Sequence, residues 1–155
     1  MFAAYEIIDI AEKLEKNGEK VYREAIAETQ NPALKALLKW MADEEVRHAE
    51  WFSRLKDEVE MSDDQSLIKE MSGALVSDFL GEQSFSLKEV DFSAIKGTRE
   101  LIEVFIEFER DTILFYEMLE AFIVDDETAQ KLRRIMDEEK DHISKLEELL
   151  RDPRA

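Results

Sequence analysis

MADEEVRHAE, residues 41–50, decides the fold, because its histidine follows a glutamate by three residues within a helix-like run. The same arrangement recurs in MDEEKDHISK, residues 136–145. The two stretches contain both histidines of the chain, each with its glutamate: Glu45 with His48, and Glu139 with His142. A spacing of three places the two side chains on one helical face, where they are able to hold one metal ion between a carboxylate oxygen and a ring nitrogen.

Glycine and proline are scarce, and the long segments between them carry apolar residues at helical spacing. Asn31 is the candidate cap of a second helix, and Pro32 suits its first position. Asp126 is the candidate cap of a fourth helix, and Pro153 forbids its continuation. The pattern therefore predicts four long helices in an all-α fold, at about residues 3–29, 32–60, 98–123 and 127–150.

Each expected helix has an apolar stripe that is interrupted by charged or imidazole groups. The interruptions are Glu15 in the first helix, Glu45 and His48 in the second, Glu109 in the third, and Glu139 and His142 in the fourth. A charged group on a core-facing stripe is costly to bury unless it is paired or binds a metal.

The chain contains an internal repeat with an offset of 94 residues. This offset relates four pairs of residues: Glu15 and Glu109, Tyr22 and Tyr116, Glu45 and Glu139, His48 and His142. In each half, the first glutamate precedes the glutamate of Glu-x-x-His by 30 residues, since 45 − 15 and 139 − 109 are both 30. A tight antiparallel hairpin then places both glutamates at one height, roughly 22 Å from the turn. We therefore expect two duplicated helical hairpins.

Packing of the two hairpins at one level would bring together four carboxylates and two imidazoles. This is the ligand set of a carboxylate-bridged dinuclear metal site in a helical bundle. Two divalent ions would neutralise the four carboxylates, whereas the empty set would raise the pKa values of its acids. A single Glu-x-x-His is more often a surface ion pair, but two copies at one repeat offset favour the metal site. Glu12 and Glu19 lack acidic repeat partners, and we expect them to flank the site in solvent.

Residues 61–97 are expected to cross the length of the bundle as one long connection. The segment suggests a shorter helix at about residues 65–80 and a looser stretch beyond Gly81. Its aromatic residues Phe79, Phe85 and Phe92 are expected to cover the bundle, with an oligomer contact as the alternative.

The composition favours one domain over residues 1–155 and excludes several classes of function. A formal net charge of −17 argues against binding to nucleic acid or to an anionic membrane surface. The chain has no cysteine, which excludes disulfides, thiolate metal sites and a catalytic thiol. No stretch approaches membrane-spanning length, and the first residues lack the pattern of a secretion signal, so we expect a cytoplasmic protein.

The sequence resembles the rubrerythrin-like branch of the ferritin-like diiron carboxylate superfamily. The resemblance rests on LEKNGEKVYREA with MADEEVRHAEWFSRL, and on FERDTILFYEML with MDEEKDHISKLEEL. It implies two iron ions bridged by Glu45 and Glu139, although manganese or zinc would also suit these donors. By the same resemblance, the other ligands are Glu15, His48, Glu109 and His142, and Tyr22 and Tyr116 donate hydrogen bonds to ligands. A core-packing role is the alternative for both tyrosines.

Two departures from the family pattern concern the reaction and leave the metal ligands intact. Full rubrerythrins carry a cysteine-ligated rubredoxin domain, and they place a further glutamate where this chain has Thr112. Gly18, one turn after Glu15, either opens room for a small oxidant or allows close helix packing.

The leading functional hypothesis is a diiron oxidoreductase that reduces hydrogen peroxide or dioxygen in oxidative-stress defence. A separate electron-donor protein, such as a rubredoxin, would supply the electrons. One alternative is a ferroxidase that takes ferrous iron as its substrate, and another is a metal-stabilised bundle with a binding role and no turnover. We expect a homodimer.

Overall fold

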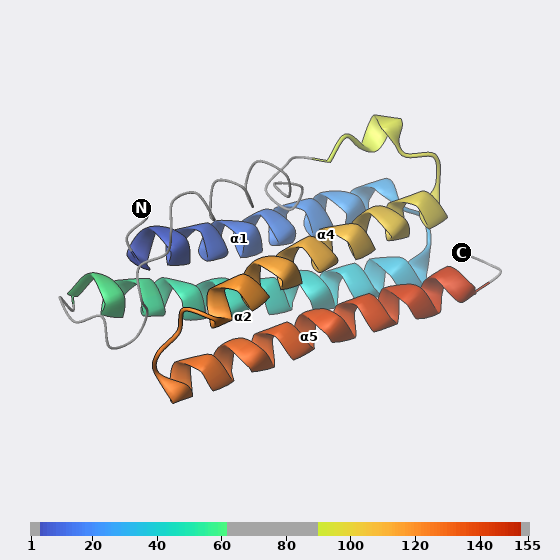
Figure 1. The fold of residues 1–155 in the computed structure, drawn as a ribbon. Helices are drawn as coiled ribbons and strands as arrows, with labels where there is room; N and C mark the ends of the chain where they lie inside the picture. The colour runs from blue at the N-terminus through green and yellow to red at the C-terminus, as the bar shows by residue number, and fades with distance from the viewer. Residues whose placement is uncertain (1–3, 62–89, 153–155) are drawn as a thin grey trace.

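The structure is a computed structural model, and it describes residues 4–61 and 90–152. The described part contains four long helices and one short 3₁₀ helix, and no strand. The helices are α1 (Ala4–Glu28), α2 (Pro32–Met61), η2 (Phe92–Ala94), α4 (Thr98–Glu120) and α5 (Asp126–Arg151). The four long helices pack side by side as a bundle (Figure 1), which confirms the predicted all-α architecture.

The chain forms two antiparallel hairpins, α1 with α2 and α4 with α5. The second helix ends at one end of the bundle, and α4 begins at the other end (Figure 1). The end of α2 and the start of α4 therefore lie at opposite ends of the bundle, which agrees with the predicted long crossover. The helix expected at about residues 65–80 lies outside the described residues, as do Phe79 and Phe85.

The start of α2 is the one that the sequence predicted. The Asn31 side-chain oxygen accepts a hydrogen bond from the Leu34 amide at 3.1 Å, and Pro32 is the first helical residue. A proline in this position loses nothing, because the first amides of a helix have no partner within the helix. Asn31 thus satisfies one of the amides that the helix itself leaves free.

The start of α5 corrects the predicted cap by one residue. Asp125, not Asp126, is the cap, and its carboxylate accepts hydrogen bonds from the Thr128 amide at 2.9 Å and the Thr128 hydroxyl at 2.7 Å. Thr128 decides between the two aspartates, because it stands three residues after Asp125 and supplies a second donor to the same carboxylate.

The third long helix ends three residues earlier than predicted, at Glu120 rather than Ile123. The next amides turn more tightly: Phe122 donates to the Leu119 carbonyl at 3.0 Å, and Ile123 donates to the Glu120 carbonyl at 3.1 Å. These are i→i−3 bonds, which are common where an α-helix ends. The apolar stripe continues through this turn, which explains why periodicity alone overextended the helix.

The bundle interior has two apolar clusters. One contains Phe52, Phe115 and Leu132, and the other contains Leu38, Phe105 and Leu146. Phe92 of η2 packs against the second cluster and is partly buried, in agreement with the predicted covering role. The six predicted ligands belong to neither cluster, so they form a polar layer within the bundle.

Among the described residues, no helix is both long enough and apolar enough to cross a membrane.

Candidate metal centre

The six side chains that the sequence singled out as ligands meet in the polar layer. All are buried, with exposed fractions between 0% and 3%: Glu15, Glu45, His48, Glu109, Glu139 and His142. They come from all four long helices, which explains why segments about 90 residues apart share one site. The prediction from helical spacing and the repeat therefore placed these six residues correctly in space.

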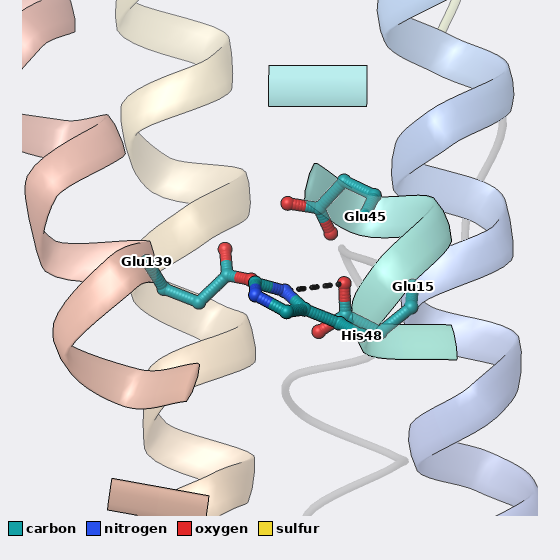
Figure 2. A group of neighbouring side chains, drawn as sticks. All are labelled: Glu15, Glu45, His48 and Glu139. Atoms are coloured by element: carbon teal, nitrogen blue, oxygen red, sulfur yellow. Dashed lines mark ion pairs between the residues drawn. The ribbon is translucent and has the colours of Figure 1, made fainter. Parts of the chain in front are cut away.

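The ligand atoms form two overlapping groups. One group is Glu15, Glu45, His48 and Glu139, and the other is Glu45, Glu109, Glu139 and His142. Within each group, one nitrogen or oxygen atom of every residue lies within 4.8 Å of the others. Figure 2 shows the first group converging from α1, α2 and α5. Glu45 and Glu139 belong to both groups, which is the position that bridging carboxylates require.

Both imidazoles turn Nδ1 toward the carboxylates. His48 Nδ1 lies 2.8 Å from Glu139 Oε1 and 3.4 Å from Glu15 Oε2. His142 Nδ1 lies 3.4 Å from one oxygen each of Glu45, Glu109 and Glu139. The nitrogen available to an ion is therefore Nδ1 in both residues.

Two buried tyrosines connect the hairpins. The Tyr22 hydroxyl of α1 donates a hydrogen bond to Glu109 of α4, and the Tyr116 hydroxyl of α4 donates to Glu15 of α1. Burial, followed by the neighbouring carboxylates, raises the pKa of both phenols well above the ordinary value. Each tyrosine therefore stays protonated and holds one carboxylate of the opposite hairpin in a fixed orientation.

Electrostatics divides the four carboxylates into two kinds. Burial, with help from Glu139, raises the pKa of Glu45 well above its usual range and that of Glu109 to about 8. The pKa of Glu15 is lowered: burial opposes this, but the charge of His48 and several hydrogen bonds, including the one from Tyr116, together outweigh it. The pKa of Glu139 is also lowered, against burial and the charge of Glu15, by its close contacts with Glu109 and the two imidazoles.

The imidazoles are held in the charged form when no ion is bound. Burial alone would lower the pKa of His48, but the carboxylates of Glu15 and Glu139 raise it to about 11. The pKa of His142 is raised further in the same way, chiefly by Glu109. Protons thus balance the charge of the metal-free layer.

Comparison with known proteins agrees with this geometry. The family model described as Rubrerythrin matches residues 6–150. The chain belongs to the rubrerythrin family. A crystal structure of a ferritin-like diiron-carboxylate protein from Thermotoga maritima is similar in fold, with a TM-score of 0.70 and 24% sequence identity. The match covers 97% of this chain and 96% of that chain. A comparison with curated protein sequences finds no significant match.

The donor atoms of this rubrerythrin-family chain fit metal ions. Six buried atoms of the layer have no hydrogen-bond partner among the described residues: Glu15 Oε2, Glu45 Oε1, His48 Nδ1, Glu109 Oε2, and both carboxylate oxygens of Glu139. Buried polar atoms without partners are costly. Carboxylate oxygen and imidazole nitrogen are donors for iron, manganese and zinc, so an ion would satisfy donor atoms that form no hydrogen bond within the described residues.

Two further residues of the rubrerythrin-family site were missed by the sequence interpretation. His48 Nε2 lies 2.6 Å from Glu138 Oε2, and His142 Nε2 lies 3.0 Å from Glu44 Oε1. An outer carboxylate that accepts the Nε2 proton fixes the ring and leaves Nδ1 for the metal. The signal was present, because 138 − 44 is 94, the offset of the ligands themselves.

Gly18 lies against Glu45, a predicted ligand of the rubrerythrin-family site. A Cβ atom at this position would lie 3.1 Å from Glu45 Oε2. The glycine therefore leaves room for the Glu45 carboxylate, which agrees with the packing interpretation.

Glu12 contradicts the expectation that it is solvated. Its side chain is buried, and its carboxylate pairs with Lys56 at 3.2 Å and with Lys16 at 3.5 Å. Glu19 is partly buried and pairs with Arg23 at 2.7 Å. Neither residue is part of the ligand groups, as the repeat predicted.

Proposed function

We propose that the chain binds two iron ions in the polar layer and reduces hydrogen peroxide with electrons from a separate donor protein. One observation carries the proposal: buried ligand atoms without hydrogen-bond partners converge from both hairpins, in a chain of the rubrerythrin family. The charge also balances, because two divalent ions carry +4 and the four carboxylates carry −4.

Each ion would have one carboxylate and one imidazole of its own. Glu15 and His48 would hold one ion, and Glu109 and His142 would hold the other. Glu45 and Glu139, which belong to both groups, would be shared. Oxygen and nitrogen donors select poorly among first-row metals, so the preference for iron rests on the family.

Iron would supply two electrons to the O–O bond, so that one peroxide, two electrons and two protons give two water molecules. The protein would supply positioning and proton control. Tyr22 and Tyr116 hold the carboxylates of Glu109 and Glu15 by donating hydrogen bonds. Glu138 is partly exposed and accepts a hydrogen bond from the Nε2 proton of His48. Glu138 would therefore connect this proton to solvent. The apolar clusters exclude bulk water from the interior.

Anaerobic iron loading followed by peroxide addition tests the proposal. The expected results are two irons per chain and rapid peroxide loss in the presence of a small-molecule reductant. Glu45→Ala should lose both properties, whereas Glu50→Ala, a change at an exposed glutamate of the same helix, should keep them. Peroxide loss no faster than in Glu45→Ala would contradict the proposal.

The same experiment separates the alternative functions. Faster consumption of dioxygen than of peroxide, with release of ferric iron, would point to a ferroxidase. A folded protein that binds no iron would point to a binding role without turnover. The homodimer, the cytoplasmic location and the role in oxidative-stress defence remain predictions.

A further inference from the structure

A groove of about 410 Å³ lies between α2 and α5 and reaches the metal centre. His48 and its partner Glu138 line it, and Trp51 lies on the α2 side. Four of the lining residues are cationic, against the two carboxylates of Glu50 and Glu138: Arg47, Arg54, Lys131 and Arg134. The helical spacing explains the alignment, because residues three, four or seven positions apart share one face of a helix.

The cationic groove is unusual for a chain with 38 acidic and 21 basic residues. Arg47 pairs with Glu44 at 2.6 Å, and Lys131 pairs with Glu127 at 3.4 Å. Arg54 and Arg134 form no ion pair or hydrogen bond within residues 4–61 and 90–152. Two exposed arginines thus lack a carboxylate partner in a protein rich in carboxylates, which leaves their charge available to an anionic partner.

The internal repeat shows that the two ends of the centre differ. The offset of 94 relates Arg134 to Trp40. At the His142 end, the Trp40 ring packs edge-on against the imidazole, with centroids 5.2 Å apart. At the His48 end, Arg134 replaces that aromatic ring, and the groove reaches the imidazole. The two copies of the repeat therefore differ at this position. At the His48 end it holds Arg134 beside the groove, and at the His142 end it holds the Trp40 ring, which packs against the imidazole.

We propose that this groove is the docking site of an acidic electron-donor protein, and that electrons enter through the contact between Glu138 and His48. This inference rests on the proposed redox function. Each encounter would oxidise the donor by one electron, and two encounters would replace the two electrons that one peroxide consumes. The hydrogen-bonded pair of Glu138 and His48, 2.6 Å apart, leads from the groove to the ligand layer.

Charge complementarity also explains how an acidic partner docks on a chain with a net charge of −17. The Debye length is about 10 Å at 0.1 M ionic strength, so repulsion from distant carboxylates is screened while close contacts with the arginines persist. Repulsion elsewhere on the surface would then select this orientation.

The test uses an acidic rubredoxin as the probe and compares two variants of equal net charge. Arg54→Glu with Arg134→Glu, and the control Lys140→Glu with Arg151→Glu, each change the net charge from −17 to −21, since each replaces two positive charges by two negative ones. All four residues are exposed. Calorimetry with oxidised rubredoxin at about 0.1 M ionic strength measures binding without turnover, and stopped flow with reduced rubredoxin measures electron transfer to the iron-loaded protein.

The expected result is at least a tenfold loss of rubredoxin affinity and electron-transfer rate in the groove variant, with less than a threefold change in the control. Reduction by dithionite should be equal in all three proteins. Equal losses in both variants, or no binding to the unchanged protein, would overturn the inference. Binding of inorganic phosphate that depends on the arginines, without any effect on rubredoxin, would also overturn it in favour of a small-anion site. Groove-dependent binding without peroxide turnover would uphold the docking site and refute the proposed function.

Discussion

At the scale of single residues, protons and metal ions compete for the same atoms. In the metal-free layer at pH 7, Glu15 and Glu139 carry −2 and the two imidazoles carry +2, while the raised pKa values keep Glu45 and Glu109 neutral. With two divalent ions bound, as proposed, the four carboxylates would be ionised and the imidazoles neutral. Both states would have zero net charge across the six side chains, so binding would exchange ions for protons.

We therefore predict that binding of two Zn²⁺ ions at pH 7 releases about four protons per chain, because Glu45, Glu109, His48 and His142 each lose one. Zinc avoids redox chemistry, and a pH-indicator dye in weak buffer measures the release. Affinity should rise with pH between 6 and 8, since the pKa of Glu109 is about 8. Release of fewer than about two protons would contradict this account of the layer.

Gly18 gives a second prediction at this scale. In Gly18→Ala the new methyl group meets Glu45 Oε2, the end of a flexible side chain, at 3.1 Å. The metal-free protein should gain up to about 1 kcal/mol of unfolding free energy from helix propensity, while metal affinity falls because the Glu45 carboxylate moves. Urea denaturation and zinc titration measure the two effects. Ser53→Ala, which also raises helix propensity but lies outside the site, should leave affinity unchanged; unchanged affinity in Gly18→Ala as well would refute the role of Gly18.

The sequence was sufficient to find the six side chains that converge in the polar layer, because each one interrupts an apolar stripe and recurs at the repeat offset. It was insufficient for Glu12, whose burial depends on a lysine of another helix, Lys56. Glu44 and Glu138 were missed for a different reason. Each contacts a histidine of the opposite hairpin, and spacing within one helix does not reveal that contact.

At the scale of elements, the cap of α2 is a local feature with a measurable contribution to stability. Asn31→Ala should lower the free energy of unfolding by about 1 kcal/mol, because the Leu34 amide loses its acceptor. Asn31→Asp keeps an acceptor oxygen and serves as the control. Urea denaturation of the metal-free forms provides the comparison, and equal stability of Asn31→Ala and the unchanged protein would contradict the capping role.

Helix starts and ends differ in how well a sequence predicts them. A cap depends on side chains within three residues, so Asn31 was identified, and the Asp125 cap was missed by one residue because two aspartates compete. The end of α4 lacks such a marker. Its apolar stripe continues into the turn, and backbone geometry alone ends the helix at Glu120.

At the scale of the whole molecule, stability of the metal-free protein should depend on pH in an unusual direction. The pKa of Glu109 is raised from 4.5 to about 8. Its contribution to the free energy of unfolding is therefore fully present below pH 4.5 and is lost as the pH rises through 8. The pKa of His48 is raised from 6.5 to about 11, so its contribution is lost as the pH rises from 6.5 through 11. The lowered pKa of Glu15 affects stability only below about pH 4.5.

We therefore predict that the metal-free protein is less stable at pH 9 than at pH 7. Urea midpoints at the two values measure the difference. Glu109→Gln, which removes one titrating group, should reduce it. An equal or higher midpoint at pH 9 in the unchanged protein would show that the layer does not control stability.

The sequence predicted the arrangement of the four helices because it contains a visible duplication. Once the first hairpin is assigned, the offset of 94 residues gives the corresponding positions of the second hairpin. The groove was not predicted. Arg54 and Arg134 come from different hairpins and are not related by the offset, so only the packing of α2 against α5 brings them to one surface.

The two tryptophans of the chain stand at opposite ends of the metal centre, Trp40 against the His142 ring and Trp51 in the groove. Iron quenches the emission of an excited indole ring nearby, whereas a docked protein changes the solvation of a ring at its interface. Fluorescence of Trp51→Phe should therefore follow the filling of the site, and fluorescence of Trp40→Phe should follow the arrival of a partner. The packing of these rings gives the protein one optical signal at each end of the centre.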